Sequence, residues 1–82
     1  MPRAPQPDPA LASVLKRLRQ QHEMTQESVA WHAGIAVATL AKIENGQTVP
    51  SWDSVCRIIA ALDVSLVDLA AAVEAEPSRD SA

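Results

Sequence analysis

The sequence contains neither phenylalanine nor tyrosine, and two tryptophans are its only large aromatic residues. A hydrophobic core built from this composition must therefore be aliphatic. Apolar residues make up 48% of the sequence, which is ample for the core of one small domain. A length of 82 residues leaves no room for a second domain. Only two glycines are present, while valine, leucine, isoleucine and alanine recur at helical spacing. These features predict a single all-α domain.

Cysteine is nearly absent as well. The single cysteine, Cys56, excludes an internal disulfide bond, and one cysteine with two histidines makes no convincing zinc-binding set. No nucleophile with a base and no acid/base pair of carboxylates is visible, so we expect no enzyme, no cofactor and no metal. No apolar run is long enough for a membrane span or a signal peptide, so a cytoplasmic protein is expected.

Positive charge is scarce. Seven basic residues face ten acidic ones, which gives a net charge of −3. The acidic excess lies in the second part of the chain, because residues 1–50 carry a net charge of +1 and residues 51–82 carry −4. Proteins that bind nucleic acid are usually basic, and this chain therefore has less positive charge than is typical of them.

The two ends of the chain differ in composition from its middle. Residues 1–7 are rich in proline and lack apolar periodicity, which predicts a disordered arm. Asp8 and Pro9 are suited to the N-cap and the first position of a helix. Residues 76–82 are polar and acidic, which predicts a disordered tail. The folded domain is therefore expected to span residues 8–75.

Three predicted helices carry an apolar stripe at helical spacing. The residues expected to face the core are Leu11, Val14, Leu15 and Leu18 in the first helix, Val55, Ile58, Ile59 and Leu62 in the fourth, and Leu66, Leu69 and Val73 in the fifth. Ser51 and Ser65 are suited to cap the fourth and fifth helices. Lys16 and Arg17 lie off the first stripe and are expected on a solvated face, with phosphate contact as the less favoured alternative.

The segment from Thr25 to Gly46 predicts two short helices joined by a tight turn. Thr25 is suited to cap the first of them. Gly34 can end that helix because glycine adopts a positive φ without steric cost. Leu40 and Ile43 then give the next helix an inner apolar face, and Gly46 ends it. This spacing is that of a helix-turn-helix.

The same segment resembles the helix-turn-helix of phage repressors and Cro proteins, the XRE family. The residues that carry the resemblance are Gln26, Ala30, Gly34, Ile35, Leu40, Ile43, Glu44 and Gly46, and the similarity extends from about residue 11 to about residue 73. It implies a compact five-helix domain that binds double-stranded DNA, usually as a homodimer, with its third helix in the major groove. The implied function is transcriptional regulation at an operator.

The resemblance also implies roles for particular residues. The third helix, at about residues 36–45, would face the DNA bases with Ala36, Val37, Ala38, Thr39 and Lys42. Phosphate contacts would come from Thr25, Gln26, Asn45, Gln47 and Thr48, although Gln26 could serve only to start its helix. Arg19 would pair with Glu44 and tie the first helix to the third, since a guanidinium can meet a carboxylate with two hydrogen bonds.

The chain departs from the family pattern at several of these positions. Ala36, Val37 and Ala38 stand where relatives usually carry polar residues. Their side chains cannot hydrogen-bond to a base edge but can touch thymine methyl groups. Specificity would then lean on DNA shape or on dimer spacing. Glu23 stands where the family usually has glycine, and a positive φ at this residue would cost on the order of 1 kcal/mol.

Two features leave alternatives open. Trp31 is either an exposed residue that invites a partner or is partly buried under the N-terminal arm. Trp52 and Cys56 either mark a dimer contact or pack partly on the core; further candidates for a twofold contact through the fourth and fifth helices are Val67, Ala70 and Ala71. The acidic balance and the apolar start of the third helix also allow another function, a protein-interaction module with little affinity for DNA.

Overall fold

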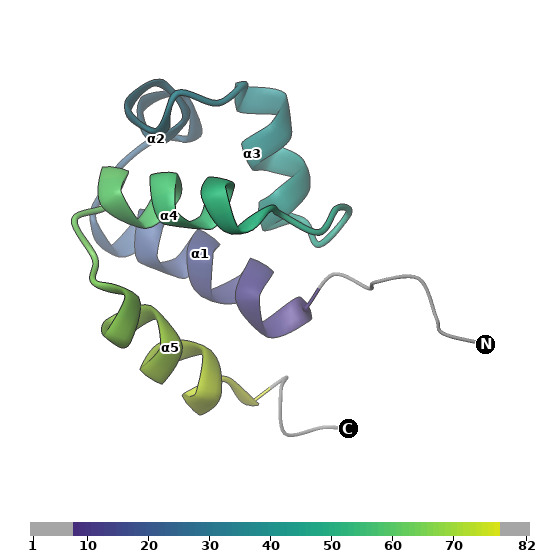
Figure 1. Cartoon of the computed structure of the whole chain (residues 1–82), viewed down its shortest axis with the longest axis vertical. Helices are drawn as coiled ribbons and strands as arrows, with labels where there is room; N and C mark the ends of the chain where they lie inside the picture. Colours follow the sequence, from purple (N-terminus) through teal and green to yellow (C-terminus); the bar gives the residue numbers. More distant parts are fainter. Residues whose placement is uncertain (1–7, 78–82) are drawn as a thin grey trace.

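The computed structural model describes residues 8–77 and places five α-helices in them (Figure 1). These are α1 (Pro9–Gln21), α2 (Gln26–Ala33), α3 (Val37–Glu44), α4 (Trp52–Ala61) and α5 (Leu66–Ala75). No strand occurs in this part of the chain. The prediction of an all-α, five-helix domain is therefore confirmed. The predicted arm at 1–7 and all but the first two residues of the predicted tail lie outside the described residues.

Capping residues set the starts of four helices. Asp8, Thr25, Ser51 and Ser65 are the N-caps of α1, α2, α4 and α5, and each side-chain oxygen accepts a hydrogen bond from a backbone amide in the first turn. The donor–acceptor distances are 2.8 Å at Asp8 and 3.0 Å at the others. The N-cap of α3 is Ala36, which has no side-chain acceptor, so α3 starts without a side-chain cap.

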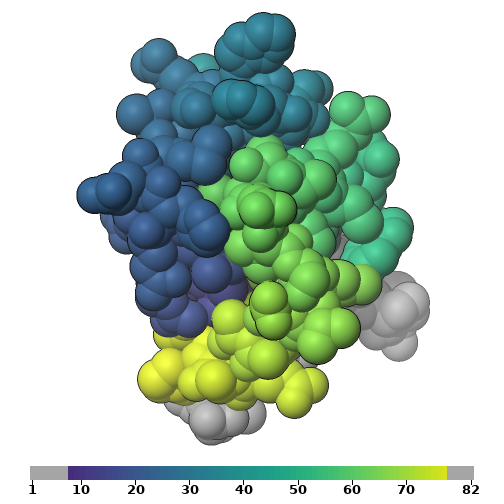
Figure 2. All heavy atoms as spheres, turned by 90° about the vertical axis from the view of Figure 1, so that its left-hand side faces the viewer, coloured from purple at the N-terminus to yellow at the C-terminus, as the bar shows by residue number. Residues whose placement is uncertain are grey.

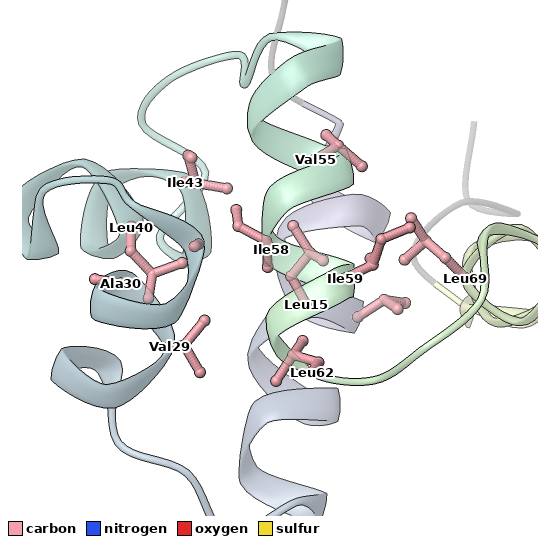
Figure 3. Close-up of a cluster of buried hydrophobic side chains, with 12 residues drawn as sticks. Leu15, Val29, Ala30, Leu40, Ile43, Val55, Ile58, Ile59, Leu62 and Leu69 are labelled. Carbon is pink, nitrogen blue, oxygen red and sulfur yellow. The ribbon is translucent and has the colours of Figure 1, made fainter.

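All five helices contribute aliphatic side chains to one core (Figure 3). Leu15, Leu40, Ile43, Ile58 and Leu62 are among its largest fully buried members. One predicted core residue is wrong: Leu66 is 45% exposed. Leu66 is the first residue of α5, and no other helix covers its side chain completely.

The order of packing separates α5 from α3. Helix α2 packs against α3 and α4, whereas α5 packs against α1 and α4, and α1 also packs against α3. Figure 1 and Figure 2 accordingly show α5 at one end of the molecule and α2 at the opposite end.

In two turns, a residue other than glycine adopts a backbone conformation that favours glycine. Glu23 and Asp63 have φ of 54° and 56°, and each follows the end of a helix. The next amide closes the turn in both cases, from Met24 N–H to the Arg19 carbonyl (3.1 Å) and from Val64 N–H to the Ile59 carbonyl (2.9 Å). The departure from the family pattern at Glu23 thus places a side chain at a positive φ, with the steric cost that this entails.

The last helix is tied to the first by an ion pair that the sequence analysis missed. Arg17, expected on a solvated face, donates from Nη1 to Glu76 Oε2 at 2.7 Å. Glu76, counted with the acidic tail, is buried against α1. The pair fixes the end of α5 on α1.

Within residues 8–77, no helix combines the length and the apolar character that crossing a bilayer requires.

Candidate nucleic-acid interface

A three-residue turn fixes α3 relative to α2. Gly34 ends α2 with a φ of 71°, and its N–H donates to the Trp31 carbonyl at 3.2 Å. The next amide, of Ile35, donates to the Ala30 carbonyl at 3.0 Å. A Cβ on Gly34 would lie 3.2 Å from Nη1 of Arg57, so both the conformation and the neighbouring side chain favour glycine here.

A buried carboxylate joins three helices. Glu44, the last residue of α3, accepts hydrogen bonds from Arg19 Nε (2.8 Å) and Arg19 Nη2 (3.1 Å) on α1. It also accepts one from Gln26 Nε2 (3.1 Å), the first residue of α2. Arg19 Nη1 in turn donates to the Met24 carbonyl at 2.8 Å. The side chain of Glu44 is only 1% exposed, so these donors replace its hydration and hold the three helices in register.

The ion pair implied by the resemblance is thus present, and it has a third member in Gln26. Since one N–H of the Gln26 side chain is held by Glu44, the orientation of that side chain is set before any ligand binds. The second N–H of the side-chain amide remains, and the first backbone amides of a helix have no partner within the helix. Gln26 can therefore both brace α3 and donate to an anion.

The five residues expected to face bases share the outer surface of α3. Ala36, Val37, Ala38, Thr39 and Lys42 are all exposed, whereas Leu40, Ile43 and Glu44 turn inward. On this surface only Thr39 and Lys42 have side chains that form hydrogen bonds. The whole predicted set is therefore exposed, and within it Ala38, Thr39 and Lys42 lie on one side of α3.

The loop after α3 is held by its own backbone. Gly46 has a φ of 70°, its N–H donates to the Ile43 carbonyl (3.1 Å), and the next amide, of Gln47, donates to the Lys42 carbonyl (2.9 Å). Because the amides of Gly46 and Gln47 are used inside the turn, a contact from Gln47 to a ligand would come from its side chain. Asn45 and Gln47 are exposed and Thr48 is half-buried.

A cleft of about 500 Å³ lies between α1 and this loop. Its lining consists of Pro9, Ala12, Ser13, Lys16, Glu44, Asn45 and Gly46. Lys16 is exposed, as expected, and it is a neighbour of the loop that is expected to contact phosphates. The sequence gives a reason to expect this position: Lys16 lies three residues before Arg19 and therefore on the same side of α1.

The cations near this surface are few. Arg19 is neutralised by Glu44, and Arg17 and Arg57 pair with Glu76 and Asp53. Among the lysines and arginines of residues 8–77, Lys16 and Lys42 are those without an ion pair. Their charges are the ones available to an anionic ligand.

These features define the class of the molecule. An exposed third helix, a glycine turn between the second and third helices, and a buried arginine–glutamate pair that braces them are the parts of a repressor-type helix-turn-helix domain. The model of a family described as "Helix-turn-helix domain" matches residues 10–72. The chain belongs to this family.

Solved structures of restriction-modification controller proteins are similar to this chain over most of its length. Wild-type C.Esp1396I is 25% identical, with a TM-score of 0.79 over 82% of this chain and 86% of that one. C.AhdI from Aeromonas hydrophila is 25% identical, with a TM-score of 0.70 over 73% and 91%. A C.Esp1396I tetramer in complex with its natural 35-base-pair operator is 25% identical, with a TM-score of 0.79 over 82% and 88%. A comparison with curated proteins finds no match.

Proposed function

We propose that this protein is a cytoplasmic transcriptional regulator that binds an operator sequence as a homodimer, with α3 in the major groove of each half-site. The observation that carries the proposal is the bracing of α3. Its outer face is exposed, while its last residue, Glu44, is locked to α1 and α2 through Arg19 and Gln26. A helix that is rigidly held with one free face is suited to reading a groove. The protein is then a binding protein and not an enzyme.

Two groups of side chains flank α3 and would hold the DNA backbone. Thr25 and Gln26 lie at the start of α2, where backbone amides and the helix dipole favour an anion. Asn45, Gln47 and Thr48 follow α3. The hydrogen bond between Gln26 and Glu44 brings the start of α2 next to the end of α3, so both groups border one surface. Such contacts set the register of the domain on the duplex.

We add Lys16 to the phosphate contacts. It lines the same cleft as Asn45 and Gly46, and it is one of the two lysines without an ion pair. A phosphate held by Asn45 would therefore find an ammonium group beside it. Lys42 provides a second charge on α3 itself.

The dimer contact is proposed on α5 and the adjoining part of α4. Val67 is 77% exposed, Leu66 is 45% exposed, and Ala70 and Ala71 are exposed as well. Because α5 lies at the other end of the molecule from α2, a twofold contact there leaves α3 uncovered. Trp52, which is 64% exposed, and Cys56 on α4 are further candidates. The similar C.Esp1396I binds its operator as a tetramer, which supports an oligomer as the DNA-binding form.

The test is selection of genomic DNA fragments by the purified protein at near-physiological salt. The control is the double variant Gln26→Ala, Lys42→Ala, with circular dichroism to show that both proteins are folded. We expect recovery of a short inverted repeat by the native protein and its loss with the variant. A folded native protein that enriches no fragment would disprove the proposal.

The exposed tryptophans favour a second candidate, a protein-interaction module. Trp31 is 75% exposed on α2, and large exposed apolar side chains often mark contacts between proteins. Salt separates the two functions. Binding that relies on phosphates weakens steeply between about 50 mM and 200 mM salt, whereas binding through apolar side chains does not.

A further inference from the structure

We propose that the start of α3 recognises methyl groups in the major groove, so that the protein selects pyrimidines with a C5 methyl, either thymine or 5-methylcytosine. The proposal rests on the proposed function, because it assumes that α3 enters the groove. It adds the chemical feature that this surface would read, and it makes binding sensitive to cytosine methylation.

The surface that carries the inference is apolar and uncovered. Val37 is 43% exposed, and Ala36 and Ala38 on either side of it are exposed. Ala36 is also the N-cap, so no polar side chain stands at the tip of the helix. The first polar side chain of α3 is that of Thr39. The part of α3 that usually carries hydrogen-bonding groups in this class thus presents only methyl groups.

Methyl groups discriminate between bases in the major groove. They gain favourable contact with the C5 methyl group of thymine, which is the apolar feature of that groove. They gain no such contact from an unmethylated cytosine or from a purine, because these bases have no methyl group at this position of the groove. Methylation of cytosine at C5 places a methyl group at the corresponding position of the ring. An apolar surface such as the start of α3 can therefore contact the methyl group of either pyrimidine.

Lys42 restricts the sequence further. It lies four residues after Ala38, on the same side of α3 and about 6 Å along its axis. A lysine can donate to O6 and N7 of guanine. Since neighbouring base pairs are about 3.4 Å apart, the expected half-site contains a methylated pyrimidine with a guanine roughly two base pairs away.

The size of the surface argues against a protein as its partner. A stable protein–protein contact buries about 800 Å² on each side. Two alanines and one half-exposed valine provide far less, and the larger exposed side chains, Trp31 and Trp52, lie on α2 and α4. A few methyl groups are enough, by contrast, to contact a few bases.

Three randomised duplex libraries test the inference, and each is put through the same selection. The first contains the ordinary bases. The second contains deoxyuridine in place of thymidine, which removes the methyl group and leaves base pairing unchanged. The third contains deoxyuridine and 5-methyldeoxycytidine, which moves the methyl group to the other pyrimidine. We expect thymine at the positions facing α3 in the first library, loss of the preference in the second, and cytosine at those positions in the third.

A matched pair of variants assigns the effect to α3. On a duplex from the first selection, we expect each contacted thymine methyl to contribute about fourfold to affinity, which corresponds to ~0.8 kcal/mol for a methyl-sized apolar group. Val37→Thr replaces a methyl group by a hydroxyl and should reduce the thymine-to-uracil ratio. Val49→Thr makes the same change at a loop valine of similar exposure, 47%, and should leave the ratio unchanged.

The outcomes separate this inference from the proposed function. Equal base preferences in all three libraries would overturn the inference and leave the proposed function standing. A folded protein that enriches no sequence from any library would overturn both, as expected for a protein-interaction module. If base preference followed the methyl group but Val37→Thr and Val49→Thr reduced it equally, the start of α3 would not be the surface that contacts the methyl group, and the inference would be wrong.

Discussion

Glu44 and Arg19 form a bidentate ion pair in which the carboxylate is almost fully buried, with the closer hydrogen bond at 2.8 Å. The pair lies 25 residues apart in sequence and connects α3 to α1. The side chain of Arg19 is 13% exposed and that of Glu44 is 1% exposed, so the carboxylate above all depends on this partner in place of water. The pair therefore matters to the fold more than a surface ion pair would.

Replacing the carboxylate should destabilise the domain strongly. We expect Glu44→Ala to lower the free energy of unfolding by about 3–5 kcal/mol, because Arg19 is left buried without its partner. A domain of this size has only about 5–10 kcal/mol in total, so the variant should lose roughly a third or more of its stability. Urea unfolding followed by circular dichroism measures the loss. Glu74→Ala removes an exposed carboxylate from α5 and should change stability by less than about 0.5 kcal/mol.

Removal of the Gln26 side chain should separate stability from binding. Gln26→Ala leaves Glu44 with both of its hydrogen bonds from Arg19, so we expect a loss of only about 1 kcal/mol in stability. Affinity for the selected operator should fall more than this loss explains, because a positioned donor to phosphate is gone. Gln20→Ala, at an exposed glutamine near the end of α1, is the control in urea unfolding and fluorescence anisotropy. Equal affinities of the two variants would remove Gln26 from the interface.

The parts of this fold that could be predicted from sequence are those with a local cause. Asp8, Thr25, Ser51 and Ser65 cap helices because a side-chain oxygen reaches an amide two or three residues away. Their positions and the helix starts follow from neighbouring residues alone. The helix-turn-helix follows in the same way from the cap at Thr25, the glycines at positions 34 and 46, and the apolar spacing between them.

Local sequence patterns do not predict contacts between segments that are distant in the sequence. The ion pair of Arg19 with Glu44 was expected only because of the family resemblance, and the pair of Arg17 with Glu76, 59 residues apart, was missed. Leu66 has the periodicity of a core residue but is exposed, since periodicity shows which side of a helix is apolar and not how far its neighbours extend over it. The spacing of Lys16 and Arg19 places both on one side of α1, but only the structure shows that Lys16 lines a cleft with Asn45 and Gly46.

A glycine at position 23 should stabilise the protein. Glu23 has a φ of 54°, which costs a residue with a Cβ about 1–2 kcal/mol, part of which glycine loses again through the entropy of the unfolded chain. We therefore expect Glu23→Gly to raise the free energy of unfolding by about 1 kcal/mol. Glu23→Ala removes the charge and keeps the Cβ. If the alanine variant gained as much stability as the glycine variant, charge and not backbone conformation would be the cause.

Lys16 should contribute to the salt dependence of DNA binding. Each phosphate neutralised by a lysine adds about 0.9 to the slope of log affinity against log salt concentration, so Lys16→Gln should reduce the slope for a dimer by about two. Fluorescence anisotropy with the selected operator over a range of salt concentrations measures it. Arg57→Gln removes the same charge from α4, where Asp53 already pairs with it, and should leave the slope unchanged. A slope unaffected by Lys16→Gln would place the cleft outside the interface.

The exposed apolar residues of α5 should hold the dimer together. Val67 is 77% exposed, and a glutamate at this position would have to be buried without a partner in a twofold contact, where it would also face its own copy. We expect Val67→Glu to raise the dimer dissociation constant at least about tenfold, the factor that corresponds to ~1.4 kcal/mol. Sedimentation equilibrium without DNA measures the change. Val49→Glu introduces the same charge in the loop after α3, where no dimer contact is proposed, and should leave the association state unchanged. Equal weakening by both variants would indicate that net charge, and not a contact on α5, controls association.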